Sequence, residues 1–129
     1  MTGIERKGGS RRRAPAESFE GHVEMEAILD DPTYGVRQNR VHFHDGGRTN
    51  WHLHVGSQVL YFVAGKGMVE QLGGPLLETE AGDIVHVTPG TRHRHGARAG
   101  ESATHVAITL GESIWDHDPR YADYDGPGA

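Results

Sequence analysis

The sequence of this chain has no cysteine and no long apolar stretch. Without cysteine there is no disulfide framework, no thiolate metal ligand and no cysteine nucleophile, so any bound metal must be held by nitrogen and oxygen donors. The longest apolar stretch, residues 59–64, is far shorter than the roughly 20 residues that span a bilayer. The arginines at 11–13 are not followed by the apolar segment of an export signal. We therefore expect a soluble, cytoplasmic protein that does not act on membranes.

Charge is unevenly distributed along the chain. The net charge is −5, yet residues 1–13 carry five basic side chains and only one acidic one. A basic arm of this kind either contacts an acidic partner or stays solvated. The rest of the chain is acidic and lacks a basic surface interleaved with aromatics, which favours a solvated arm and argues against a nucleic-acid partner. We predict a flexible basic arm over residues 1–18.

Sustained helical periodicity is also missing, except over the short segment 114–121, which Pro119 interrupts. From residue 36 onward, short alternating or apolar runs are separated by glycine-rich or proline-containing turns, a pattern typical of an all-β sandwich or barrel. The length accommodates one domain, which we place at residues 19–115, followed by an acidic tail at 116–129. The expected strands are residues 36–44, 50–54, 58–64, 67–72, 76–80, 83–87, 93–97 and 104–110, with 19–29 as a further strand or an arm.

The chain contains ten histidines, and several share one face of a predicted strand. His52 and His54 are two residues apart, so both imidazoles point to the same side of their strand. His93 and His95 have the same spacing on another strand, and His105 lies on the last one. Imidazoles that converge inside a barrel suit manganese, iron, nickel, copper or zinc and are a poor match for calcium or magnesium. The pattern predicts a transition-metal site.

The residues around the first histidine pair form a motif. From Gly46 the chain reads Gly-x5-His52-x-His54-x3-Gln58-x6-Gly65. This motif resembles the first signature of the cupin family, Gly-x5-His-x-His-x3-4-Glu-x6-Gly, at every spacing. The departure is one of residue type, because Gln58 stands where the family has glutamate.

A second motif lies further along the chain. From Gly82 the chain reads Gly-x5-Thr88-x-Gly90-x2-His93-x3-Ala97. It resembles the second cupin signature, Gly-x5-Pro-x-Gly-x2-His-x3-Asn, although Thr88 replaces the proline and Ala97 the asparagine. Pro89 and Gly90 preserve the turn, so we expect little structural effect from these two changes.

The resemblance implies an all-β fold of the cupin type, a double-stranded β-helix or jelly-roll barrel. It also implies one divalent transition-metal ion held by His52, His54, Gln58 and His93. Within the family the chain is similar to the small bacterial single-cupin proteins that include the manganese-dependent hydroxynitrile lyases, which favours manganese over iron, nickel, zinc or copper. The stretches that carry this similarity are residues 48–54, 82–85, 89–96 and 104–108.

The glutamine in the ligand set changes the expected chemistry. Three neutral imidazoles and the neutral amide of Gln58 leave the full charge on the ion, which favours Lewis-acid chemistry over oxidised states. His95 and His105 are the candidate catalytic residues, as proton carriers for a small hydroxylated or carbonyl substrate. We therefore expect a redox-neutral lyase, by cyanohydrin cleavage or by a related elimination or aldol-type cleavage. A metal-dependent dioxygenase and a cupin that only binds a small ligand remain as alternatives.

Other residues have simpler expected roles. His42 and His44 share the outward face of their strand, where surface histidines are favoured over a second metal site. Apolar residues on the outward face of the last strand need cover, which predicts a homodimer. These are Val106, Ile108 and Leu110. The predicted pocket walls are Asn39, Val41, Phe43, Leu60, Phe62 and Thr109.

Overall fold

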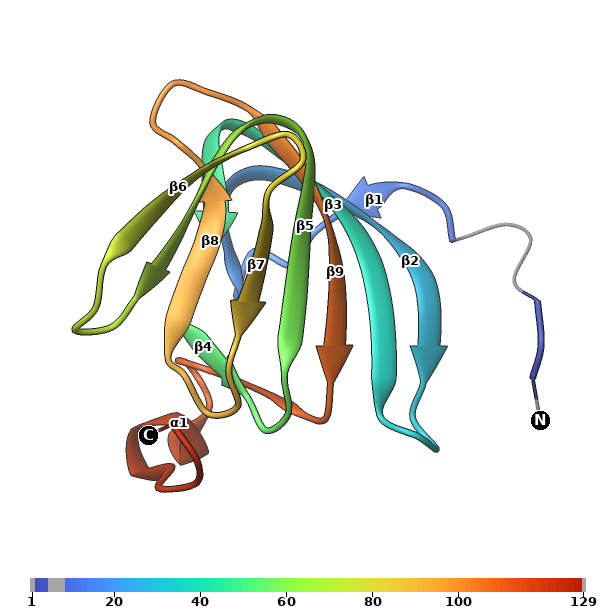
Figure 1. Ribbon diagram of the computed structural model, residues 1–129, viewed down its shortest axis with the longest axis vertical. Helices are drawn as coiled ribbons and strands as arrows, with labels where there is room; N and C mark the ends of the chain where they lie inside the picture. Colours follow the sequence, from blue (N-terminus) through green and yellow to red (C-terminus); the bar gives the residue numbers. More distant parts are fainter. Residues whose placement is uncertain (1, 5–8, 129) are drawn as a thin grey trace.

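Strands make up most of the chain in a computed structural model that describes residues 2–4 and 9–128 (Figure 1). The elements in chain order are β1 (Arg12–Arg13), β2 (Phe19–Asp31), β3 (Val36–Thr49), β4 (His52–His54), β5 (Gln58–Gln71), β6 (Leu76–Glu80), β7 (Ile84–Val87), β8 (His93–Ala97), β9 (Ala103–Leu110), β10 (Ser113–Trp115) and α1 (Pro119–Asp123). The prediction of an all-β fold is confirmed. No helix in these described residues has the length and apolar character that crossing a bilayer requires.

The strands close into a barrel because the strand order returns on itself. Neighbouring strands follow the order β1-β2-β3-β9-β5-β8-β4-β10, with β6 and β7 also paired to β5. An additional pairing between β3 and β8, at Arg48 and Gly96, joins two strands that are not neighbours in this order. A sheet that closes in this way encloses an interior lined by alternate residues of its strands.

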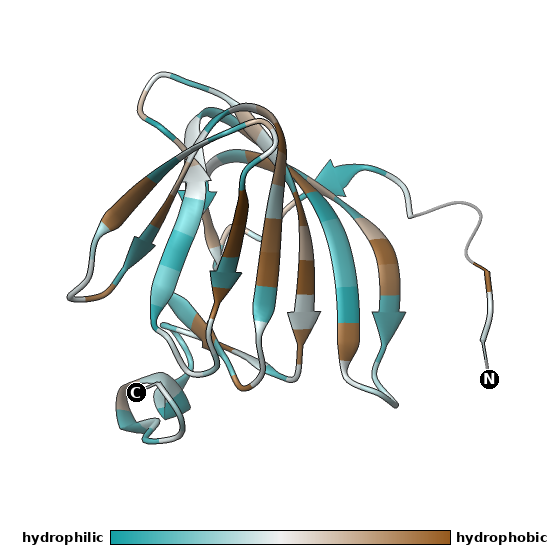
Figure 2. Ribbon diagram, viewed as in Figure 1, coloured by the Kyte–Doolittle hydropathy of each residue, from teal (hydrophilic) through white to brown (hydrophobic). Residues whose placement is uncertain are grey.

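The inward and outward faces follow the alternation in the sequence. In β9, His105, Ala107 and Thr109 are buried, whereas Ile108 and Leu110 are 39% and 41% exposed. Figure 2 shows how apolar and polar residues follow one another along the strands. The inward orientation predicted for His105 is therefore observed.

Two predicted turns are continuous strand. β3 runs through residues 45–47, where Asp45 and Gly46 have φ values of 47° and 75°, and β5 runs through Gly65, with φ 76°. Left-handed residues inside a strand bend it and locally disturb its pairing without ending it, as in a β-bulge. A register shift between Phe62 and Ala64 accompanies the bend in β5. The glycines that suggest turns in the sequence therefore mark bends of two long strands.

Segments near both ends of the chain lie against the barrel. β1 pairs with β2, the backbone N–H of Ala14 donates to the carbonyl of Val23, and Ala14 is buried in the core. Residues 12–14 of the predicted arm thus contact β2, whereas residues 1 and 5–8 lie outside the described part of the chain. At the other end Pro119 begins α1 rather than interrupting it, because proline is tolerated in the first turn, and Asp118 caps the helix.

Candidate metal centre

Two neighbouring strands, β4 and β8, carry four histidines into the barrel. His52 on β4 pairs directly with His93 on β8. His54 and His95 lie two residues further along their strands, so they share the inward face with His52 and His93. All four side chains are at most 4% exposed. Strand pairing fixes their backbones, and the rings are therefore held close together.

Backbone carbonyls orient two of these rings. The Nδ1–H of His52 donates to the carbonyl oxygen of Asn50, and the Nδ1–H of His93 donates to that of Thr91, each at 2.8 Å. Because a carbonyl only accepts hydrogen bonds, each neutral ring carries its proton on Nδ1 and has a free lone pair on Nε2. Both rings thus have the protonation and the carbonyl partner of metal-binding histidines.

His54 and Gln58 supply further donor atoms. His54 Nδ1 lies 2.7 Å from Ser113 Oγ, and its Nε2 is buried without a hydrogen-bond partner. The amide nitrogen of Gln58 donates to Thr109 Oγ1 at 2.9 Å, and Gln58 Oε1 lies 3.0 Å from His93 Nε2. Since His93 has its proton on Nδ1, this last contact brings two lone pairs together. A cation bound by both atoms removes that repulsion, so these residues fit a metal ion.

One tight cluster of ring nitrogens includes His95, which the sequence predicts as a proton carrier and not as a ligand. The potential ligand atoms of His52, His93 and His95 all lie within 4.8 Å of one another. His54 contacts this group, with ring centroids 4.9 Å from His52 and 5.2 Å from His93. The structure thus brings together the four predicted ligands and adds His95, which the sequence predicts as a proton carrier.

His95 and His105 form a hydrogen-bonded pair beside this group. His105 Nε2 lies 2.9 Å from His95 Nδ1, while His95 Nε2 and His105 Nδ1 are buried without partners. Phe43 and Phe62 contact the His105 ring edge-on, with centroid distances of 5.0 and 5.2 Å. The proton between the two rings can belong to either nitrogen, so a proton gained at one ring can be passed to the other. The pair therefore has the geometry of a proton relay.

Burial lowers the pKa of every histidine in this interior. It is the largest cause for His54, whose pKa falls to about 3, and for His93 and His105, whose pKa values fall to about 4. Burial likewise holds the pKa values of His52 and His95 well below their usual range. All five rings are consequently neutral at pH 7, and a neutral imidazole can serve as a metal ligand or as a base.

A cavity of about 190 Å³ is lined by four of these histidines, His52, His54, His95 and His105. Pockets for drug-sized ligands are larger, from roughly 300 Å³ upward, so this cavity suits a small molecule. Its lining includes three of the predicted walls, Asn39, Val41 and Thr109. The prediction is wrong for Phe43, Leu60 and Phe62, which belong to the buried core. The His105 ring packs against the two phenylalanines and lines the cavity itself.

Arg37, Ser113 and Trp115 line the cavity and support the predicted ligands from outside the predicted site. Arg37 Nη2 donates to Ser113 Oγ at 2.7 Å, and Ser113 contacts His54. Trp115 stacks on His52, with ring centroids 4.2 Å apart. Ser113 and Trp115 lie on β10, where they pair with His54 and His52 of β4. No pattern in the sequence indicates β10, which is three residues long, so the sequence does not show that Ser113 and Trp115 lie beside His54 and His52.

Sequence comparisons give two matches to known proteins. Residues 39–109 match a family model described as a cupin domain. Over 97 residues, which make up 74% of this chain and 74% of the relative, the sequence is 37% identical to an (R)-mandelonitrile lyase of Granulicella tundricola. The six predicted site residues all lie within the segment that matches the cupin domain.

Solved structures resemble the whole chain. A cupin-like protein of Thermotoga maritima is 27% identical, with a TM-score of 0.77 over 98% of this chain and all of that one. An acetylacetone dioxygenase of Acinetobacter johnsonii also has a TM-score of 0.77, over 95% of this chain and 91% of its own, at 16% identity. At that identity the second likeness concerns the fold alone.

Proposed function

Because this chain belongs to the cupin family, as its domain match and its 37% identical relative show, we propose that it is a metal-dependent, redox-neutral lyase acting on a small hydroxylated or carbonyl compound. The name of that relative, (R)-mandelonitrile lyase, supports hydroxynitrile cleavage over the related eliminations and aldol-type cleavages. The observation that carries the proposal is the His95–His105 pair. It lies beside the metal-binding groups and lines the same cavity, where cleavage of a hydroxylated substrate needs a base.

We assign His52, His54, Gln58 and His93 as the ligands of one divalent ion. The unpartnered Nε2 of His54 and the facing lone pairs of Gln58 and His93 support this set. His95 is assigned to proton transfer instead. Its Nδ1 faces the imidazole of His105, whereas His52 and His93 are each oriented by a backbone carbonyl. Manganese is the metal we propose, and the same donors accept iron, nickel, zinc and copper.

Gln58 favours a lyase because it brings no charge to the ligand set. When bound, a divalent ion supplies Lewis acidity toward a substrate oxygen. A glutamate at this position would cancel part of the ion's charge and stabilise oxidised metal. The neutral amide, held by its hydrogen bond to Thr109, leaves the charge available to the substrate.

The histidine pair accounts for the proton in cyanohydrin cleavage. His95 Nε2 has no partner and belongs to a cavity-lining residue, so it can accept the proton of the substrate hydroxyl. The Nδ1–H of His95 then donates to His105 Nε2, which stabilises the charged ring. The bond between the carbinol carbon and the nitrile carbon breaks, and its electron pair leaves with cyanide. His95 returns the proton to cyanide, giving a carbonyl compound and hydrogen cyanide without an oxidant.

The test of this function uses racemic mandelonitrile and manganese-loaded protein in the absence of oxygen. We expect benzaldehyde and cyanide to be released in equal amounts, and release to stop when the metal is removed. Turnover that requires oxygen would favour the dioxygenase. If no cyanohydrin is cleaved and metal-free protein binds the substrate as tightly as loaded protein, the chain is a binding protein and the proposal fails.

A second test isolates the relay. His105→Gln keeps a polar side chain against Phe43 and Phe62 but removes the imidazole. We expect it to retain its metal and to lose about 10²- to 10⁴-fold in kcat, the range associated with a general acid or base. His86→Gln is the matched control, because His86 is exposed on β7 and contacts Ser57. Full activity in His105→Gln with an unchanged pH profile would remove His105 from the mechanism.

A further inference from the structure

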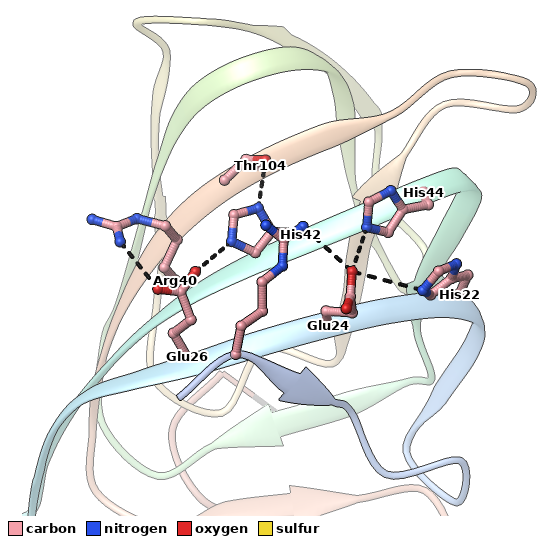
Figure 3. A network of polar contacts seen from close by, with 8 residues as sticks. His22, Glu24, Glu26, Arg40, His42, His44 and Thr104 are labelled. Carbon is pink, nitrogen blue, oxygen red and sulfur yellow. Dashed lines mark hydrogen bonds and ion pairs between the residues drawn. The ribbon is translucent and has the colours of Figure 1, made fainter. Parts of the chain in front are cut away.

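A second group of histidines and carboxylates lies on the outer face of the β2–β3 pair (Figure 3). Figure 3 shows His22 and His44 directed at Glu24, and Arg40 and His42 directed at Glu26. These side chains are on the outside of the barrel, whereas the histidines of the candidate metal centre are inside it. The group therefore takes no part in the proposed lyase chemistry.

Three of these residues converge on one point. His22 and His44 are paired across β2 and β3, and Glu24 lies two residues from His22 on the same face. His44 Nε2 lies 2.9 Å from Glu24 Oε1, and His22 Nε2 lies 3.7 Å from the same oxygen. The three potential ligand atoms all lie within 4.8 Å of one another. Two imidazole nitrogens and a carboxylate oxygen are a ligand set found in zinc sites that keep a position open.

His42 is excluded from this convergence although it lies on the same face. Its Nε2 lies 2.6 Å from Glu26 Oε1 and its Nδ1 lies 3.2 Å from Thr104 Oγ1. Both ring nitrogens are thus engaged. In contrast, Nε2 of His22 and Nε2 of His44 face a single shared oxygen of Glu24.

The side chains can adjust and leave room for solvent ligands. Those of His22, Glu24 and His44 are 48%, 29% and 32% exposed. Ligand distances of about 2.0–2.2 Å from a zinc ion need only side-chain rotations from the present spacing. A surface hollow of about 260 Å³, lined in part by Arg11 and His44, adjoins the group. Arg11 Nη2 lies 3.3 Å from Glu24 Oε1, so the guanidinium of Arg11 competes with a metal ion for this carboxylate.

We propose that His22, Glu24 and His44 form a second, surface site for a divalent transition-metal ion of the zinc, nickel or copper class. Arg11 occupies the carboxylate when the ion is absent. Exposed ion pairs contribute little to stability, so a role in folding does not account for the convergence of two imidazoles and a guanidinium on one oxygen. The site is separate from the cupin centre, because its ligands come from the outer face of β2 and β3.

The test counts zinc ions bound to untagged protein at equilibrium. Saturating zinc fills the interior site in every variant, so the surface site appears as a second, weaker ion. We expect two ions per chain in the wild type and one in His44→Ala or His22→Ala. His42→Ala is the matched control on the same strand and should still bind two. The ligand variants should bind the second ion more than about tenfold more weakly, because loss of an outer partner alone costs about 10- to 100-fold. They therefore hold one ion at the zinc concentration that just fills both sites of the wild type.

Two further measurements address the ligands and the competitor. Copper bound at the second site should show hyperfine splitting from two imidazole nitrogens in its electron paramagnetic resonance spectrum, and from one in His44→Ala. Arg11→Ala should bind the second zinc ion several-fold more tightly, and weaker binding there would contradict the competition. A wild type that binds one ion, or ligand variants that still bind two with unchanged affinity, would overturn the site.

Discussion

Gln58 determines the charge of the proposed ligand set, and its replacement tests that role. In Gln58→Glu we expect tighter metal retention and a fall in kcat of at least about tenfold, equivalent to about 1.4 kcal/mol of barrier, because the carboxylate lowers the Lewis acidity of the site. Metal content after dialysis against a chelator and the rate of mandelonitrile cleavage measure the two effects. Gln71→Glu, the same change at the other end of β5, is the control. Equal metal retention in both variants would contradict the assignment of Gln58 as a ligand.

Ser113 orients His54 from outside the ligand set. Its hydroxyl lies 2.7 Å from His54 Nδ1 and accepts a hydrogen bond from Arg37. Because such outer partners fix the tautomer and orientation of a ligating ring, Ser113→Ala should weaken metal affinity by about 10- to 100-fold. Competition with a chromogenic chelator measures the change. Ser57→Ala removes a comparable serine–histidine contact on the outside of the barrel, at 3.0 Å from His86, and should leave the affinity unchanged.

At the scale of residues, spacing along the sequence predicts which site residues share one face of a strand. His52 and His54 share a face because strand periodicity places them there, and the motif spacing adds Gln58 and His93. The contact between His95 and His105 depends on how β8 and β9 lie in the closed barrel, which spacing along the chain does not contain. That is why the sequence proposes both as proton carriers but does not predict that they are hydrogen-bonded to each other.

Among the elements, β3 and β8 lie close together at Gly96, which pairs with Arg48. A Cβ added to Gly96 would lie 2.5 Å from the carbonyl oxygen of Gly47 and 2.6 Å from Arg48 Cα. Because both neighbours are backbone atoms, Gly96→Ala must shift one strand, and overpacking of this kind costs about 1–3 kcal/mol. Urea unfolding measures the loss. Gly74→Ala, in an exposed turn where the nearest atom is the Cβ of Gln71 at 3.2 Å, should leave stability within about 0.5 kcal/mol. Equal stabilities of the two variants would argue against the close approach.

Element boundaries are predictable where turns are sharp and not where glycines bend a strand. Alternation of buried and exposed residues places β9 and β8 within a residue of their observed bounds. At Gly46 and Gly65 the sequence predicts turns, since glycine favours both a turn and a left-handed bend inside a strand. Whether the glycine forms a turn or a bend depends on how its segment pairs with strands far away in sequence. The same holds for β10, which exists because β4 lies beside it.

For the whole molecule, the buried histidines make stability depend on pH. The pKa of His105 is about 4 in the folded protein, against 6.5 for an unburied ring. Between these values the unfolded chain binds a proton that the folded chain does not, so metal-free protein loses stability as pH falls from 6.5 to 4 and keeps its full stability above 6.5. The loss attributable to this group is about 3 kcal/mol. Urea unfolding at pH 7 and pH about 4.5 measures most of it.

Matched variants identify the source of this dependence. His105→Gln should show a shallower loss of stability over the same range, and His86→Gln should follow the wild type, because His86 is exposed. Hydrogen bonds from His44 and His42 lower the pKa values of Glu24 and Glu26 from 4.5, so these carboxylates add to the loss only at the acid end of this range. A wild type equally stable at both pH values would contradict the prediction.

The outer face of β7, β5 and β9 carries apolar side chains in a row. Tyr61 pairs with Ile84 on one side and with Val106 on the other, and Ile84 and Tyr61 are 67% and 45% exposed. We propose that a second copy of the chain covers this face, since contiguous exposed apolar surface marks an interface. Ile84→Lys should shift sedimentation from dimer to monomer, whereas Leu72→Lys, at an equally exposed position after β5, should not. A monomeric wild type would contradict the dimer.

The place of His105 in the barrel has one more consequence. Its far nitrogen, Nδ1, is buried without a hydrogen-bond partner, and its ring is packed against Phe43 and Phe62. The proton path therefore ends at His105. A proton that enters the pair from the cavity must return to the cavity through His95. Such a path can lend a base to a reaction that moves a proton between two places on one substrate, and it cannot drain protons to the solvent. The pair therefore accepts one proton and releases it again within each turnover, and its original protonation state is restored.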